Sequence, residues 1–494
     1  MRNRNGRVLI LGAGPAGLAL AMRLLRRPGS ASEVVVVERE PRVGGITASF
    51  EYEGLTFDYG SHRLHPSTPA WILRDIGGLL GPDLLKRPRN GRIRLCGRFV
   101  KFPLDPLDLM LRLHPRFLAG VCLDTLKRPF APGRRRGDSY ADVLLNGLGR
   151  TVCEAFYFPY ARKLWGLAPG EISAAQARSR VSANSVAGIV RKVFLPSAGN
   201  GNGNGMKGKF YYPSKGFGQI CEAMAREVRK LGGEIKLSRD VVKTNLDGDR
   251  VTGVHISPAG AKTKKSQGDS REAVQAPEEI RADIVFSTIP VTSLAGTLAP
   301  AAPAAVARAA SALRYRGMVF LYLVLETGRF TPYDAHYFPE SDFIFSRISE
   351  PKNYSGSGRP SGTTGLCLEI PCRPGGLIWN ASAEELSDIA IRDMNAAGLP
   401  IKCRIRTRFI RRNPKIYPVY DMDHAQWFWT IDNYLKRLSG LVCLGRQALF
   451  VHDNVHHAIG MAYRAAECLG PQLDWDARRW RNYRQEFKKN TVED

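Results

Sequence analysis

The first residues of chemical interest are three glycines near the start of the chain, Gly12, Gly14 and Gly17, in the spacing GxGxxG. The first permits a tight turn, the second lets backbone N–H groups approach a pyrophosphate, and the third lets a helix pack close to a sheet. Glu38 follows where a carboxylate can accept hydrogen bonds from a ribose. The pattern predicts a dinucleotide site formed by Gly12, Gly14, Pro15, Ala16, Gly17 and Glu38.

A second pair of glycines, Gly44 and Gly45, follows Glu38 and Arg39. Glycine allows the backbone to approach a ligand closely, and a second approach at this point suits a cofactor longer than NAD. The run 38–45 resembles the extended fingerprint of FAD-binding proteins of the amine oxidase, protoporphyrinogen oxidase and UDP-galactopyranose mutase superfamily. The resemblance implies tightly bound FAD, held also at Arg39, Gly44 and Gly45.

Four further segments resemble the mutase-related branch of that superfamily: residues 57–65, 160–173, 417–421 and 445–462. The cofactor-binding residues taken with them are Gly60, Ser61, His62, Val241, Gly445, Arg446, Asn454, His457 and Ala458. The substrate-binding residues are Trp165, Arg180, Tyr417, Tyr420 and Arg446.

Three histidines are candidates for proton transfer, because neutral histidine can act near pH 7. They are His62, His65 and His452. Ordinary alternatives stay open: the first two could be turn residues, Trp165 could fill the core, and Arg446 could make a surface salt bridge.

The chain departs from the mutase pattern at three places. His452 stands where the mutases carry a tyrosine, residues 454–457 replace an acidic stretch, and Arg178 and Arg180 only flank the position of an expected arginine. These departures concern recognition of UDP-galactose and leave the implied FAD site intact.

The elements that must position these residues follow a βαβ pattern. The apolar runs 8–11 and 34–37 predict buried parallel strands on either side of a helix at 16–26. A further helix is expected at 216–232, and further strands are expected at 235–237, 251–254, 282–286 and 441–444.

The predicted fold class is α/β, with a discontinuous Rossmann-type FAD-binding domain interleaved with an α+β substrate domain that carries a helical cap. We assign 1–75, 215–300 and 437–494 to the FAD-binding domain, and 76–214 and 301–436 to the substrate and cap domain. The run of alternating glycine and asparagine at 199–205 predicts a mobile loop.

Composition limits the partners. The 494 residues include 72 Lys and Arg against 46 Asp and Glu, a net charge of +26, which favours anionic ligands, acidic membranes or nucleic acid. Helix-turn-helix, zinc and RNA-binding signatures are absent from the sequence, which argues against nucleic acid. The nine cysteines form no CxxC pair and no metal-binding cluster, as expected of a cytoplasmic protein without a metal site.

Basic and apolar stretches leave peripheral contact with an anionic membrane open. Residues 86–101, 402–412 and 478–489 are basic, and the last run, with interleaved aromatic residues, could form an interfacial helix. Residues 102–126 are rich in Leu, Met and Phe, and could form either a membrane-dipping lid or a helical cap over the active site.

The function predicted from these features is that of an FAD-dependent oxidoreductase. It would act by hydride transfer on a small anionic or lipid-linked substrate of a sugar-derivative or secondary-metabolite pathway. One alternative is a redox-neutral UDP-galactopyranose mutase-like sugar isomerase that uses reduced FAD. Another is a non-catalytic, membrane-associated FAD-binding protein. The oligomeric state stays open.

Overall fold

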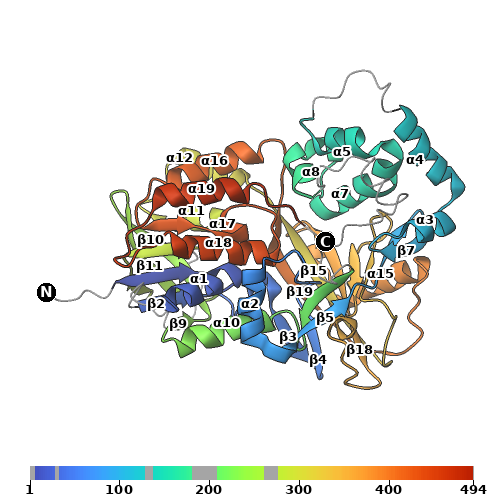
Figure 1. The fold of residues 1–494 in the computed structure, drawn as a ribbon, viewed down its shortest axis with the longest axis horizontal. Coiled ribbons are helices and arrows are strands. Elements are labelled where there is room, and N and C mark those ends of the chain that lie inside the picture. Colours follow the sequence, from blue (N-terminus) through green and yellow to red (C-terminus); the bar gives the residue numbers. More distant parts are fainter. Residues whose placement is uncertain (1–5, 28–32, 128–136, 181–207, 261–275, 493–494) are drawn as a thin grey trace, which may run out of the picture.

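The computed structural model describes residues 6–27, 33–127, 137–180, 208–260 and 276–492. The predicted loop at 199–205 lies outside these residues. Figure 1 shows a lobe built on a parallel sheet beside a second lobe that contains a larger sheet and a group of helices. Among the described helices, none is both long and apolar enough to cross a membrane.

A five-stranded parallel sheet forms the core of the first lobe. The predicted apolar runs 8–11, 34–37, 282–286 and 441–444 all overlap its strands, as continuous apolar runs suit strands that are buried on both faces. In sheet order the strands are β20 (Leu441–Cys443), β13 (Ile284–Ser287), β1 (Arg7–Leu11), β2 (Glu33–Val37) and β9 (Glu234–Lys236).

Helices cover both faces of this sheet. Val8 and Ile10 pack on one face with α1 (Pro15–Leu25), α10 (Gln219–Lys230) and α18 (Val455–Glu467). The alternate residues Leu9 and Leu11 pack on the other face with α11 (Val291–Thr297), α12 (Ala304–Ala312) and α16 (His424–Leu435). The predicted α/β fold class is confirmed.

A four-stranded sheet packs into the same core as Leu9 and Leu11. The predicted strand at 251–254 lies in the second strand of its longest hairpin, whereas the first strand of that hairpin was not expected from the sequence. The strands are, in sheet order, β12 (Glu278–Arg281), β11 (Arg250–Pro258), β10 (Arg239–Asp247) and β14 (Leu298–Ala299).

A seven-stranded, mostly antiparallel sheet forms the core of the second lobe. One face is covered by α15 (Ala383–Ala396), and the other by the hairpin of β3 (Ser49–Tyr52) and β4 (Leu55–Asp58). The strands are, in sheet order, β19 (Ile405–Pro418), β15 (Tyr315–Leu325), β18 (Thr364–Cys372), β17 (Arg347–Ser349), β16 (Ala335–Tyr337), β6 (Gly91–Leu95) and β7 (Arg98–Phe102).

A group of helices with its own small core lies beside this sheet. It contains α5 (Tyr140–Leu148), α6 (Arg150–Val152), α7 (Phe158–Trp165) and α8 (Ala174–Arg180). Lys163 joins it to the sheet lobe, since its Nζ donates to the carbonyl oxygens of Phe338 and Phe345 at 2.8 and 3.1 Å. The apolar segment 102–126 forms α3 (Pro106–Arg112) and α4 (Pro115–Lys127) at the outer margin of this lobe (Figure 1).

The predicted basic helix at 478–489 is α19 (Ala477–Phe487). Its aromatic side chains face inward: Trp480 is buried, Phe487 packs edge-on against it, and the Tyr483 hydroxyl donates to Glu467 Oε2 at 2.6 Å. The remaining elements are α2 (Ala70–Leu80), β5 (Leu84–Pro88), β8 (Lys209–Pro213), α13 (Pro351–Ser355), α14 (Leu377–Asn380) and α17 (Gly445–Ala448).

Candidate functional site

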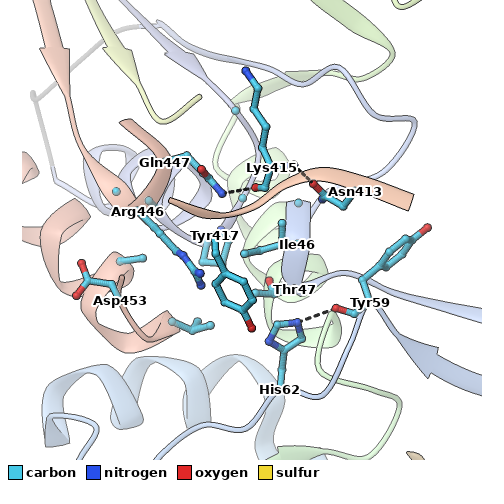
Figure 2. A pocket seen from close by; sticks show the side chains of 18 of the residues that line it. Ile46, Thr47, Tyr59, His62, Asn413, Lys415, Tyr417, Arg446, Gln447 and Asp453 are labelled. Atoms are coloured by element: carbon cyan, nitrogen blue, oxygen red, sulfur yellow. Dashed lines mark hydrogen bonds between the residues drawn. The ribbon is translucent and has the colours of Figure 1, made fainter. Parts of the chain in front are cut away.

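A cavity of about 610 Å³ lies where the two lobes meet. From the first lobe it is lined by residues directly after β1, β2, β13 and β20, at the carboxyl ends of the parallel strands. Ligands bind at this edge in open α/β sheets. From the second lobe it is lined by residues of β16, β17, β18 and β19. Figure 2 shows several of these side chains converging on one space.

The glycine motif forms the turn between β1 and α1. Gly12 has φ +101°, and its N–H donates to Val37 O at 2.8 Å, so the turn is tied to β2. A Cβ on Gly17 would overlap the carbonyl oxygen of Gly12, whereas a Cβ on Gly14 would meet no atom within 4 Å. Gly12, Gly14, Pro15 and Ala16 line the cavity, while Gly17 packs inside α1. The N-terminus of α1 therefore opens on the cavity, as a phosphate group requires.

Glu38 follows β2 and lines the cavity. Its Oε2 accepts from Ala13 N at 2.8 Å and its Oε1 from Glu40 N at 2.9 Å, so the carboxyl group is tied to the glycine turn. Burial raises the pKa of this carboxyl above its usual value. A carboxylate offers about four acceptor positions, so hydroxyl donors can still be accommodated. Arg39 lines the cavity beside it.

The second glycine pair lies against the first turn. Gly45 lines the cavity, and a Cβ on it would lie 3.8 Å from Gly14 Cα. Gly44 lies behind it, with its N–H donating to Ala13 O at 2.8 Å. The two motifs thus build one continuous wall.

The C-terminal segment supplies another wall. Gly445, Arg446, Asn454 and Ala458 line the cavity together with Val241 of β10. Arg446 Nη2 donates to Ile416 O at 3.1 Å, and Gln447 Nε2 donates to Lys415 O at 2.8 Å, which ties α17 to β19 (Figure 2). His457 lies outside the lining at the start of α18, 3.3 Å from Asp453.

His62 and Ser61 enter the cavity on the loop that follows β4. His62 Nε2 lies 3.0 Å from Tyr59 O, and since a carbonyl only accepts, Nε2 carries the hydrogen and Nδ1 is an acceptor. Burial lowers the pKa of the ring, which is therefore neutral at pH 7. In Figure 2 the Tyr417 ring, which also lines the cavity, points toward His62.

The other two histidines have different surroundings. His65 lines the cavity and its Nδ1 contacts Ser67 Oγ at 2.7 Å. His452 is buried behind the lining, where its Nε2 donates to Pro418 O at 2.9 Å. Its ring stacks on Tyr417 with a centroid distance of 6.0 Å. It can therefore position Tyr417.

Three predicted substrate residues are not placed against the cavity. Trp165 is buried in the core of the helical group, with its ring 5.4 Å from that of Tyr140. Tyr420 is buried, and its hydroxyl donates to Phe450 O at 2.9 Å. Arg180 ends α8, and its side chain lies outside what the structure describes. Gly60 also lies behind the lining, packed against Phe320 and Glu369.

Sequence reasoning missed several arginines that line the cavity, among them Arg63, Arg89 and Arg347. We call these three the arginine wall. Each lies over an aromatic ring, those of Phe210, Phe102 and Tyr337 respectively, with centroid distances of 5.1, 5.0 and 5.6 Å. The signal available in the sequence was the basic run that contains Arg89; Arg63 lies inside the 57–65 motif, and Arg347 has no local signal.

One arginine of the wall is held rigidly. Arg347 makes two hydrogen bonds of 2.8 Å to Glu369, which also accepts from Ser61 N at 2.7 Å. Arg63 lies 3.4 Å from Asp334, which is outside the lining. Among the described residues that line the cavity, nine are Lys or Arg and five are Asp or Glu, so the site favours anionic ligands.

Comparisons with known proteins agree with this geometry. The family model of flavin containing amine oxidoreductases matches residues 15–413. Protoporphyrinogen oxidase 1, chloroplastic, of Arabidopsis thaliana is 27% identical over 179 residues, which cover 35% of this chain and 33% of that protein. Phytoene desaturase (lycopene-forming) of Pantoea ananas is 23% identical over 261 residues, which cover 50% and 52%. The chain thus spans about a third to about half the length of these curated relatives.

Among solved structures, the crystal structure of reduced UDP-galactopyranose mutase superposes with a TM-score of 0.74 at 18% identity. The match covers 94% of this chain and 93% of the other. At this identity the likeness concerns the fold.

Proposed function

The chain belongs to the family of flavin containing amine oxidoreductases, and from that premise we propose that it is an oxidoreductase that removes hydride from a small anionic or lipid-linked substrate. FAD is the cofactor, and when bound it supplies the hydride acceptor. The observation that carries the proposal is the single cavity that joins the glycine turn and Glu38 to the arginine wall.

The first lobe would hold the cofactor. Gly14 leaves open space in front of α1 for the pyrophosphate, and the Glu38 carboxylate would accept from the ribose. The remaining predicted residues that line the cavity would contact other parts of FAD: Gly12, Pro15, Ala16, Arg39, Gly45, Ser61, His62, Val241, Gly445, Asn454 and Ala458.

The second lobe would orient the substrate. Its arginine wall, together with Arg446 of the first lobe, would bind an anionic group, and the Phe210 and Tyr337 rings, which also line the cavity, would pack on an apolar part of the substrate. His62 Nδ1 would accept a proton, because the ring is neutral and its Nε2 hydrogen is bound to Tyr59 O. His65 is the second candidate at the lining.

Two further features support narrower parts of the proposal. All nine cysteines are free thiols, which supports a cytoplasmic location. The segments that resemble UDP-galactopyranose mutases, 57–65, 160–173, 417–421 and 445–462, support a redox-neutral sugar isomerase as the alternative activity.

The test starts from the purified full chain. Its bound cofactor and any co-purified small molecule are released and identified by mass spectrometry, and the recovered compound is then used as substrate. Turnover is measured with the oxidised enzyme and an electron acceptor, and separately with the chemically reduced enzyme under nitrogen.

Oxidation of the compound by the oxidised enzyme is the expected result. Activity that appears only after reduction of the flavin would overturn the hydride-removal proposal in favour of the isomerase. Bound FAD without turnover in either state would support a non-catalytic flavoprotein. A colourless protein that cannot be reconstituted with FAD would contradict the assignment of the cofactor site.

A further inference from the structure

Exposed apolar side chains are concentrated in one short stretch of the chain. Of the eleven large apolar side chains exposed within the described residues, six lie between residues 104 and 126. They belong to α3, α4 and the turn before α3, at the outer margin of the second lobe (Figure 1). We call them the leucine ridge: Leu104, Leu107, Met110, Leu111, Leu123 and Leu126.

The ridge follows from helical spacing. Leu107 and Leu111 are four residues apart on α3, so they share one face of the helix, while Leu113, just after the helix, is buried. Leu104 lies in the turn before α3. Leu123 and Leu126 are likewise three apart on α4, a helix without a single fully buried residue. A surface helix usually keeps its apolar side chains against the core, so apolar residues exposed together indicate an interaction site.

Of the four basic residues beside the ridge, Lys101 pairs with Asp105 at 3.7 Å and Arg112 with Asp108 at 2.8 Å, whereas Arg116 and Lys127 have no ion pair among the described residues. All four are exposed. The nearby carboxylates are engaged with the protein: Asp105 accepts from Asp108 N at 2.9 Å, Asp108 accepts from Lys101 N and Arg112 Nε at 2.7 and 2.8 Å, and Asp124 accepts from Thr151 N at 2.6 Å. Basic residues beside exposed leucines are the pattern of helices that lie on anionic lipid surfaces.

We propose that the leucine ridge docks the protein on an anionic lipid bilayer. A second copy of this chain is a poor occupant, because a symmetric contact would bring the same cations together in a protein of net charge +26. A protein partner is also less suited, because leucine is under-represented among the residues that dominate binding at protein interfaces, and five of the six ridge residues are leucines.

The position of the ridge suggests how docking on a membrane could serve substrate binding. Phe102, two residues before Leu104, carries Arg89 of the arginine wall and lies 5.0 Å from the ring of Tyr337, which lines the cavity. A docked molecule would therefore hold the wall close to the lipid headgroups, where a lipid-linked anionic substrate resides. This use rests on the proposed function; the docking itself does not.

The test measures flotation of the full-length, FAD-loaded protein with two kinds of vesicle. One is phosphatidylcholine alone, and the other is phosphatidylcholine mixed with phosphatidylglycerol. The ridge variant is Leu107→Asn with Leu111→Asn, and its matched control is Leu377→Asn with Met422→Asn, two apolar residues exposed elsewhere. The charge variant is Arg116→Gln with Lys127→Gln, matched by Arg281→Gln with Arg404→Gln, whose side chains are 82% and 78% exposed.

We expect the wild type and both controls to float with the anionic vesicles and much less with the neutral ones. The ridge variant should bind about tenfold more weakly for each leucine removed. The charge variant should lose about fivefold for each cation, and the loss should shrink as salt is added. Every variant should keep the flavin absorbance of the wild type, because none of the altered residues lines the cavity.

Three results would overturn the proposal. The first is wild-type protein that floats with neither kind of vesicle, or equally with both. The second is a ridge variant that binds the vesicles as well as its control does. The third is a wild-type dimer that becomes a monomer in the ridge variant. The last result would assign the ridge to self-association. A yellow enzyme that oxidises its substrate but does not float would contradict docking alone, whereas a floating protein without turnover would contradict only the proposed function.

Discussion

At the scale of single residues, glycines of one motif have opposite surroundings. A Cβ on Gly14 meets open space and its φ of −78° suits any residue, whereas a Cβ on Gly17 overlaps the Gly12 carbonyl. We therefore expect Gly14→Val to change the free energy of unfolding of the cofactor-free protein by less than about 1 kcal/mol, yet to weaken FAD binding by two orders of magnitude or more. Titration of the apoprotein with FAD, followed by flavin fluorescence, measures the affinity.

Gly17→Val is the matched control, because its side chain has no space in the fold. It should destabilise the cofactor-free protein by about 3 kcal/mol. Equal FAD affinity in the Gly14 variant and the wild type would remove this turn from the cofactor site.

The Glu38 carboxyl group should make FAD binding depend on pH. Burial raises the Glu38 pKa above 4.5 in the cofactor-free protein, and ribose hydroxyls that donate to the carboxylate stabilise its charged form. FAD binding therefore lowers this pKa. Affinity should be full above the raised pKa and should fall as the pH drops through it, beginning above pH 4.5. In Glu38→Gln this part of the pH dependence should vanish, and an identical pH profile in both proteins would contradict the ribose contact.

Arg446 separates cofactor binding from substrate binding. Its guanidinium lies over the Tyr417 ring and lines the cavity, with Nη2 bound to Ile416 O. Lysine keeps the charge but loses the planar fork that holds an oxyanion in two places. Arg446→Lys should keep the yellow colour and lose about 1.5–3 kcal/mol of substrate affinity, measured as an increase in KM. Unchanged kinetics in both Arg446→Lys and Arg446→Ala would place this residue outside the site.

At the scale of elements, α19 unites a basic outer face and an aromatic inner face. Trp480 is 7% exposed and packs against Trp475 and Phe487 in the core of the first lobe. We expect Trp480→Ala to lower the free energy of unfolding by about 3–5 kcal/mol. Arg478→Gln with Lys488→Gln on the exposed face should change it by about 0.5 kcal/mol at most, as chemical denaturation can measure. Similar losses in the two proteins would show that the helix is held by its charges.

The elements that could be predicted from the sequence are those whose pattern is local. A continuous apolar run such as 8–11 is buried on both faces of a parallel sheet wherever the rest of the chain goes, and the structure has β1 at Arg7–Leu11. In contrast, the one fully buried residue of β10 is the polar Thr244, so this strand has no buried apolar run and its pairing with β11 gives no comparable local signal. The inward turn of Trp480 was also missed, because an aromatic residue among arginines suits an interface as well as a core.

The site residues also differ in whether a local sequence pattern predicts them. Residues beside the glycine motifs could be assigned to one turn from their spacing, and Gly12, Gly14 and Glu38 do line one cavity. The arginine wall could not be foreseen, because Arg89 and Arg347 are brought together by the pairing of β16 with β6 and β17. Arg63 joins them through tertiary contacts with Tyr354 and Asp334. A tryptophan at position 165 could either stack on a ligand or fill a hydrophobic core. The sequence is the same in both cases, and only the tertiary packing shows that Trp165 lies in a core.

At the scale of the whole molecule, the cavity is built from distant parts of the chain. Its lining includes the turn at 12–16, β10, the ends of β13 and β20, and strands of the seven-stranded sheet. A ligand that fills it contacts both lobes at once and binds the folded state only. Loss of either lobe would therefore release the ligand, so binding couples the stability of the two lobes.

The coupling of the two lobes should be visible in thermal unfolding. A ligand that binds only the folded protein adds about 2.7 kcal/mol at a free concentration of ~100 Kd. With an unfolding entropy of about 2.1 cal/mol/K per residue, FAD at that concentration should raise the Tm of this chain by about 2–3 °C and keep a single transition. Calorimetry of the apoprotein over a range of FAD concentrations measures the shift. Gly14→Val should start from the same Tm and gain nothing, because its fold is intact and its site is blocked. A wild-type Tm that does not change with FAD concentration, or two transitions of which only one shifts in temperature, would show that the cofactor does not join the lobes.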